Sequence, residues 1–283
     1  MREVIMGTTP SPTFRRRRLA KKLKAIRKST GMTLAEAALA LYKQPSALSR
    51  IEKGRAKADV HLVRSMMDLY DVRDDELIEL ALQAAKPGWW VRYGIRDRGY
   101  IGLETEATEV LSSQLVYIPG LLQTEAYMRA LFASGKVKRT KKQLDNDVAA
   151  RLYRQRRITD EDSALRLHAI IDESALRKLV GGRKIMRDQL DHVVMMAEVD
   201  NVTVQVLPDA LGAHDGMDGA FTILRFAEEQ DSDFMYVEYT TGSIHVEKDD
   251  EVAEGKLVFD GLCEQALSPK DSVALIERVA AQL

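Results

Sequence analysis

Residues 33–54 (TLAEAALALYKQPSALSRIEKG) contain two short helix patterns joined by a tight turn. The first pattern begins at Thr33, because Thr33 and Glu36 have the T-x-x-E spacing of a capping box, which marks the start of a helix. Its apolar stripe runs from Leu34 to Leu41 and includes small alanines, which allow a neighbouring helix to pack closely. The segment therefore predicts a compact helix pair in which the second helix lies against the first.

The second helix pattern has an apolar side and a polar, basic side. Gln44 stands at its N-cap, and Pro45 occupies the first helical position, where the missing N–H costs nothing. Leu48 and Ile51 face the core, and Gly54 ends the helix because glycine readily adopts the left-handed conformation. The residues left on outward faces are Ser46, Ala47, Ser49, Arg50 and Lys53. A second helix of this kind fits the major groove of DNA, where arginine binds guanine and hydroxyls contact bases or phosphates.

Basic residues are concentrated at the N-terminal end of the chain. Residues 1–70 contain 16 Lys and Arg against 5 Asp and Glu, whereas the whole chain has a formal net charge of -1. The rest of the chain is therefore acidic. This asymmetry predicts a polyanionic partner for the N-terminal region alone.

Three further helix patterns flank this pair, so residues 14–86 are predicted to form an all-α domain. One helix covers about residues 15–29 and ends before Gly31, and two later helices begin at the N-caps Asp59 and Asp74. Arg15, Arg16, Arg17 and Arg18 crowd the polar face of the first helix. This run has two interpretations, a solvated helix face or a set of contacts with DNA phosphates.

Residues 15–82 resemble the helix-turn-helix domain of the lambda-repressor/Cro class, the XRE family, most specifically in the S-x-L-S-R-I-E-K-G motif at residues 46–54. The resemblance implies a transcription regulator that binds double-stranded DNA, with Ser46 and Arg50 at base edges. The expected DNA contacts in and around the pair are Thr33, Lys43, Gln44, Ser46, Ala47, Ser49, Arg50, Lys53 and Arg55. Because most such proteins bind two half-sites as dimers, we expect a homodimer and an inverted repeat.

Two residues of this region call for a separate interpretation. A carboxylate at Glu52 would repel phosphate, and the family pattern implies that Glu52 pairs with Arg27 and braces two helices. Tyr42 stands in the turn where the family often has glycine. Either the turn is built differently, or Tyr42 adopts a strained positive φ.

Pro87-Gly88 breaks the helix pattern and predicts a domain boundary, with residues 87–283 forming a second domain. Strand-like and helix-like segments both occur there, which predicts an α+β fold with an antiparallel sheet. The expected strands are residues 114–118, 165–171, 202–206, 220–226, 234–239 and 243–247, with a tight hairpin at Thr241-Gly242. The expected helices are residues 101–111, 121–133, 141–157, 174–179, 184–197, 250–266 and 270–282.

Blocks such as YIPGLLQTEAYMRALF, HAIIDESALR and DGAFTILRF are similar to a C-terminal domain found behind this kind of N-terminal region in actinobacterial regulators. The similarity implies that the second domain binds an effector or a partner and is a candidate for dimerisation. Such regulators are commonly paired with a small protein encoded next to them, and some are antitoxin-like. The alternative function is therefore an antitoxin-like module that neutralises this small protein and autoregulates its operon.

Two groups in the second domain are candidates for ligand binding or acid–base chemistry. His214 and Asp215 lie in a glycine-rich loop, and Asp172 and Glu173 stand at a strand-to-helix junction. The plainer explanations are a turn for the loop and helix capping by Asp172. The zinc spacings C-x-x-C and H-E-x-x-H are absent, and no serine has a histidine at a readable spacing. We therefore expect a non-enzymatic protein without metal or cofactor.

The remaining features concern the cellular compartment. Residues 1–13 lack the apolar stretch of a signal peptide and are expected to form a flexible arm. No apolar run approaches the ~18 residues of a membrane helix. Cys263 is the only cysteine, which excludes an intrachain disulfide, and its expected role is structural rather than that of a redox switch. These features predict a cytoplasmic protein without a membrane partner.

Overall fold

The computed structural model describes residues 12–95, 99–135, 139–228, 231–240 and 242–283. The described residues divide into two compact units. The N-terminal unit comprises the described residues up to 92 together with 99–106, and the C-terminal unit comprises 93–95 and the described residues from 107 onward. The domain boundary near residue 87 stays a prediction, and the arm at residues 1–13 lies almost wholly outside the described residues.

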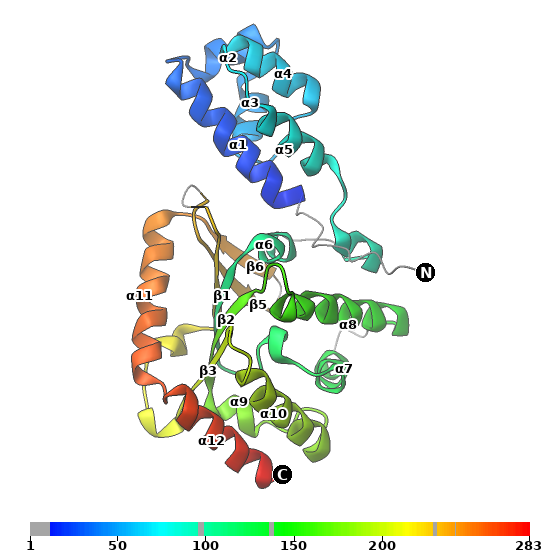
Figure 1. Cartoon of the computed structure of the whole chain (residues 1–283), viewed down its shortest axis with the longest axis vertical. Coiled ribbons are helices and arrows are strands. Elements are labelled where there is room, and N and C mark those ends of the chain that lie inside the picture. The colour runs from blue at the N-terminus through cyan, green and yellow to red at the C-terminus, as the bar shows by residue number, and fades with distance from the viewer. Residues whose placement is uncertain (1–11, 96–98, 136–138, 229–230, 241) are drawn as a thin grey trace. The chain divides into compact units, whose positions relative to one another are not determined.

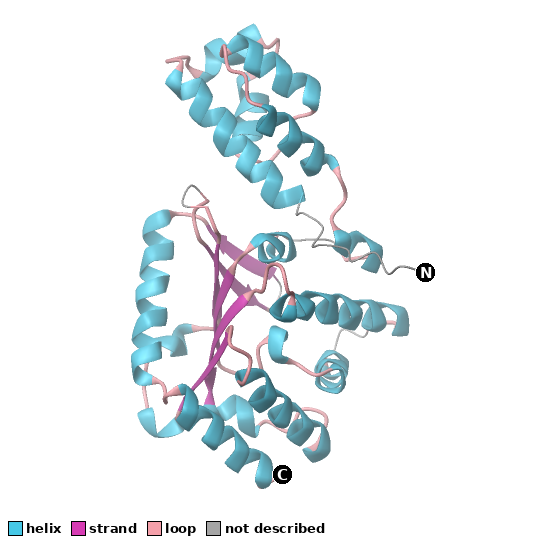
Figure 2. Cartoon of the chain, in the orientation of Figure 1, coloured by secondary structure: helices cyan, strands magenta, loops and turns pink. Residues whose placement is uncertain are grey.

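The N-terminal unit is built from helices, as predicted (Figures 1 and 2). Its α-helices are α1 (Pro12–Ser29), α2 (Leu34–Ala40), α3 (Pro45–Glu52), α4 (Val60–Leu69), α5 (Asp75–Ala85) and α6 (Tyr100–Glu106), with a 3-10 helix at Trp89–Tyr93. Helix α1 begins three residues earlier than expected, since a proline is tolerated in the first helical turn. Buried side chains from α1 to α5 form one hydrophobic core, which includes Leu23, Leu48, Val63, Met66 and Leu77.

The C-terminal unit has a six-stranded mixed sheet in the order β3-β2-β1-β4-β5-β6. The strands are β1 (Glu109–Gln114), β2 (Arg166–Asp172), β3 (Val202–Leu207), β4 (Phe221–Arg225), β5 (Phe234–Tyr239) and β6 (Gly242–Val246). The β1/β4, β4/β5 and β5/β6 pairs are antiparallel, while β1/β2 and β2/β3 are parallel. The α+β class is therefore confirmed, and the sheet is mostly antiparallel. The predicted turn residue Thr241 lies outside the described residues.

Helices cover both faces of this sheet. They are α7 (Glu125–Ser134), α8 (Lys141–Gln155), α9 (Glu173–Arg177), α10 (Arg183–Ala197), α11 (Asp249–Gln265) and α12 (Pro269–Ala281). Figure 1 shows α11 on one face and α7, α8 and α10 on the other. Under α11, Phe259 and Leu262 pack against Ile170 and Ile223 of the central strands. The burial of each such side chain contributes roughly 1.5–3 kcal/mol to the stability of the folded state.

The segment before Pro119 was predicted incorrectly. We expected a helix over residues 101–111 and a strand over 114–118, but helix α6 ends at Glu106 and strand β1 occupies Glu109–Gln114. Strand β1 has neighbours on both sides, and its four middle residues are all buried. A strand covered on both faces has no alternation of polar and apolar residues, so its sequence lacks the period-two signal.

Candidate nucleic-acid interface

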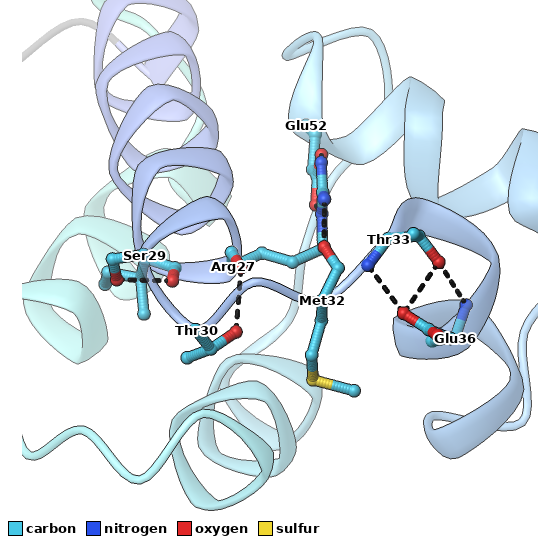
Figure 3. Close-up of polar contacts among 8 residues, drawn as sticks. Arg27, Ser29, Thr30, Met32, Thr33, Glu36 and Glu52 are labelled. Carbon is cyan, nitrogen blue, oxygen red and sulfur yellow. Dashed lines mark hydrogen bonds and ion pairs between the residues drawn. The ribbon is translucent and has the colours of Figure 1, made fainter.

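Helix α2 is held in place by the predicted capping box (Figure 3). The Thr33 hydroxyl accepts a hydrogen bond from the Glu36 backbone N–H at 3.2 Å, and the Thr33 N–H donates to Glu36 Oε2 at 2.8 Å. The bond from the Thr33 backbone N–H is the main cause that holds the pKa of Glu36 below its usual value. Thr33 thus has a structural role, and its side chain is also exposed as a DNA contact requires.

The predicted pair of Arg27 and Glu52 is confirmed and joins α1 to α3 (Figure 3). Arg27 Nε donates to Glu52 Oε1 at 2.7 Å, and a second guanidinium nitrogen donates to Glu52 Oε2 at 2.8 Å. Arg27 also donates to the Met32 carbonyl at 2.7 Å, at the entry to α2. The hydrogen bond with Glu52 raises the pKa of Arg27, and burial with the nearby Glu52 charge raises the pKa of Tyr70 to about 12.

Tyr42 accepts the strained conformation in the turn between α2 and α3. Its φ is 53°, and its side chain is 99% exposed. The turn is closed by hydrogen bonds from the Tyr42 N–H to the Leu39 carbonyl at 3.1 Å and from the Lys43 N–H to the Ala38 carbonyl at 2.8 Å. Of the two alternatives for this turn, the structure contains the second, and the aromatic ring projects into solvent.

Helix α3 separates buried anchors from exposed polar residues. Leu48, Ile51 and Glu52 are buried. The exposed candidates are Gln44, Ser46, Ala47, Arg50, Lys53 and Arg55, while Lys43 and Ser49 are half-buried. The candidates within α3 therefore lie on the side of the helix that faces away from the core, as the sequence predicted, and the others flank the two ends of the helix.

The N-terminus of α3 differs from those of the helices around it. Asp59 accepts a hydrogen bond from the Leu62 N–H in α4, and Asp74 accepts one from the Glu76 N–H in α5. Gln44 occupies the N-cap of α3, but its side chain makes no such bond. Pro45 has no N–H, and the Ala47 and Leu48 N–H groups donate to the Gln44 carbonyl at 2.9 and 3.1 Å. No side chain thus caps the first turn of α3, and the helix dipole favours an anion there.

Gly54 brings α1 close to the end of α3. Its φ is +66°, which glycine adopts without strain, and a Cβ at this position would lie 3.2 Å from Arg17 Cγ and 3.3 Å from Arg17 Cα. A larger residue would push the two helices apart. Gly54 therefore helps to set the direction of α3.

The arginines at the start of α1 have acidic neighbours within the N-terminal unit. The Arg15 guanidinium lies 3.1 Å from Glu106, and that of Arg18 lies 3.4 Å from Glu76. Glu76 also binds Lys22, and this hydrogen bond is the main cause that lowers the pKa of Glu76. Both arginines thus contribute to the structure of the unit. Arg16 and Arg17 are half-buried beside them.

In the C-terminal unit the structure brings two of the four candidate residues together. His214 Nε2 lies 3.6 Å from Asp172 Oδ2, although the two residues are far apart in the sequence. Asp172 also caps α9 by accepting from the Ser174 N–H at 2.9 Å, which confirms the plainer explanation. Asp172 at the end of β2 therefore contacts both α9 and the glycine-rich loop.

Glu173 and Asp215 do not join that pair. Glu173 binds Arg177 and accepts from the Asp209 N–H at 3.0 Å. Burial acts to raise the pKa of Glu173, but these two hydrogen bonds outweigh it and leave the pKa lowered. Asp215 is exposed. Across the described residues, His, Cys, Asp and Glu form no cluster of three or more that could bind a metal ion.

The helix pair, the buried anchors of α3 and its polar outer face define a helix-turn-helix protein that binds DNA. A family model described as a helix-turn-helix domain matches residues 18–81, which supports a DNA-binding regulator rather than an enzyme. The chain belongs to the family described as a domain of unknown function (DUF5753), whose model matches residues 97–278. No curated protein and no solved structure matches the chain. Within the described residues, none of the helices has the length and apolarity to cross a membrane.

Proposed function

We propose that this protein is a sequence-specific transcriptional regulator of the XRE type, which reads an operator with α3. The observation that carries the proposal is the division of α3 into a buried side and a polar side. Leu48 and Ile51 anchor the helix in the core, while Ser46, Ala47 and Arg50 are exposed. A helix anchored in this way presents a fixed set of side chains to the edges of base pairs.

Arg50 is the strongest candidate for a base contact. Its side chain is exposed, and it stands one turn after Ser46 on the outer side of α3. A guanidinium group donates two hydrogen bonds to the O6 and N7 atoms of guanine, and such a pair contributes about 1–3 kcal/mol of discrimination. Ser46, Ala47 and Ser49 are near enough along the helix to contact neighbouring bases. We therefore assign the sequence preference mainly to Arg50.

Contacts with the DNA backbone are assigned to residues around α3. Lys43 and Gln44 lie at its N-terminus, where no side chain caps the helix and the helix dipole favours a phosphate. Thr33, Lys53 and Arg55 are exposed nearby in the sequence. Arg15 to Arg18 remain part of the proposal as phosphate contacts.

The C-terminal unit is proposed to modulate DNA binding and to dimerise the chain in the cytoplasm. The match of this region to a separate family model supports a distinct role, and the acidic excess of the region disfavours direct contact with DNA. The alternative is an antitoxin-like role, in which this unit binds a small protein encoded next door. That alternative rests on the resemblance to actinobacterial regulators alone.

DNA from the region upstream of the protein's own gene provides the test of this proposal. We expect the full-length protein to bind this duplex more tightly than an unrelated one, as measured by fluorescence anisotropy. Arg50→Ala should weaken specific binding by about 1–3 kcal/mol and leave the unrelated duplex almost unaffected. Equal losses on both duplexes would mean that Arg50 is only a phosphate contact.

A second variant tests the phosphate contacts. Replacing Arg15 to Arg18 in the full-length protein should make the slope of log binding constant against log salt concentration shallower by up to about 0.9 per lost phosphate contact.

A further inference from the structure

Tyr42 combines two properties that structure alone does not account for. Its φ of 53° lies in the left-handed region, which a tyrosine adopts only with strain. Its side chain is 99% exposed, so packing against the protein does not compensate for that strain. Glycine would form the same turn without cost. An exposed tyrosine in this conformation, unlike an aspartate such as Asp71, whose short polar side chain tolerates it, indicates a function that requires the side chain.

The turn that contains Tyr42 leads directly into α3. Lys43 and Gln44 follow Tyr42, and α3 begins at Pro45. Leu39, one turn earlier, is 79% exposed, so the end of α2 and the turn share an exposed apolar surface. In the proposed complex this surface lies beside the DNA backbone, next to the first turn of α3. The sequence identified Tyr42 as a departure from the usual glycine with a positive φ as one alternative, and the structure adds that its side chain is exposed.

The chemistry of this surface suits the DNA backbone rather than a base edge. A phenol hydroxyl donates a hydrogen bond to a phosphate oxygen, and the ring packs against the apolar edge of a deoxyribose. Contacts of this kind fix the position of a protein on the duplex but carry no sequence information. A rigid tyrosine also loses little conformational freedom on binding, since it has only two side-chain torsions.

We propose that Tyr42 is a positioning residue that holds the DNA backbone beside α3 and sets the depth of α3 in the major groove. The ring is exposed in the turn directly before α3, where a helix that enters the groove by its N-terminal end brings the chain close to the phosphate–sugar backbone. This inference rests on the proposed function, because it requires that α3 enters the groove. The Tyr42 contact would be uncharged, whereas the proposed phosphate contacts of Lys43 and Lys53 are made by charged groups.

The test compares three variants of the full-length protein. Tyr42→Gly removes the strain and the ring, Tyr42→Phe removes only the hydroxyl, and Asp71→Gly is the matched control. Asp71 is exposed and has a φ of 51° in the turn between α4 and α5. Thermal unfolding measures stability, and fluorescence anisotropy measures binding to upstream DNA and to an unrelated duplex of equal length.

We expect Tyr42→Gly and Asp71→Gly both to raise the midpoint of thermal unfolding, because glycine adopts a positive φ without the strain that a Cβ causes there. Only Tyr42→Gly should weaken DNA binding, by about tenfold on either duplex, and Tyr42→Phe should show a smaller loss. The salt dependence should stay as in the wild type, since a phenol displaces no counterion. The opposite signs of the two effects on Tyr42→Gly exclude unfolding as the cause of weaker binding.

Three outcomes would overturn the inference, and they are distinguishable. If the wild-type protein binds both duplexes and Tyr42→Gly binds them equally well, Tyr42 does not contact DNA while the proposed function stands. If the wild-type protein binds no duplex, the proposed function fails and the role of Tyr42 fails with it. A loss confined to the upstream DNA would make Tyr42 a base contact and would also contradict the inference.

Discussion

At the scale of single residues, the ion pair between Arg27 and Glu52 fixes the position of α3. Its two hydrogen bonds measure 2.7 and 2.8 Å, and the side chains are 9% and 4% exposed. Removing one partner leaves the other charge buried without compensation, so Glu52→Ala should lower the free energy of unfolding by about 3–5 kcal/mol. Urea denaturation measures the loss.

The matched control is an ion pair in solvent. Asp68 lies 3.6 Å from Arg73, and the two side chains are 66% and 89% exposed. Asp68→Ala should change the free energy of unfolding by less than about 1 kcal/mol. Equal losses from Glu52→Ala and Asp68→Ala would mean that the buried pair contributes no more than a surface contact.

The single cysteine offers a second measurement at this scale. Burial, with the charge of nearby Asp260, raises the pKa of Cys263 to about 11. At pH 7.5 the thiolate fraction is then roughly a hundredfold smaller than in an unperturbed thiol. We expect a thiol reagent to react far more slowly with the native chain than with the chain in urea. A native rate close to the unfolded one would show that Cys263 is a reactive thiol.

Residue-scale expectations succeeded where the interaction is local or belongs to a known pattern. The capping box of Thr33 and Glu36 follows from their spacing, and the Arg27–Glu52 pair follows from the family pattern. The contact between His214 and Asp172 did not follow, because 41 residues separate them and only the sheet brings them together. Sequence patterns report contacts within one element far better than contacts between loops.

At the scale of elements, the helix N-termini of the N-terminal unit have two different designs. Helix α4 is capped by Asp59, whereas the Gln44 side chain makes no capping bond in α3. Asp59→Ala should therefore cost about 1 kcal/mol of stability and leave DNA binding unchanged. Gln44→Ala should leave the stability unchanged, because the Gln44 side chain makes no capping bond, and should reduce the affinity for every duplex. A stability loss from Gln44→Ala equal to that from Asp59→Ala would assign Gln44 to the helix rather than to DNA.

Elements with a clear period were predicted well. Helices α10, α11 and α12 begin and end within about two residues of expectation, because each has an amphipathic pattern and a turn residue at its boundary. Strand β1 was missed because Ser112 and Ser113 are buried at its centre. A buried polar strand resembles neither a helix nor a half-exposed strand in the sequence.

At the scale of the whole molecule, the order of the sheet could not be read from the sequence. The short connections of β4, β5 and β6 predicted antiparallel neighbours, and this part was correct. The parallel pairs β1/β2 and β2/β3 depend on crossover connections that contain helices. Local periodicity does not reveal which strands such a connection brings together.

The distribution of charge along the chain separates the same two regions as the proposed functions. The basic excess belongs to the first 70 residues, while the rest of the chain is acidic. This division supports DNA binding by the N-terminal unit and a different role for the C-terminal unit. A homodimer would place two copies of α3 on half-sites about one helical turn apart.

Selection of duplexes from a random pool by the full-length protein shows whether α3 reads the bases of an operator. If α3 reads bases, the wild-type protein will enrich a two-fold symmetric sequence, and Arg50→Ala will lose the preference for one guanine in each half-site while the other positions keep theirs. If Arg50→Ala enriches the same sequence with the same guanine, or if the wild-type protein enriches no sequence, α3 does not read the operator through Arg50.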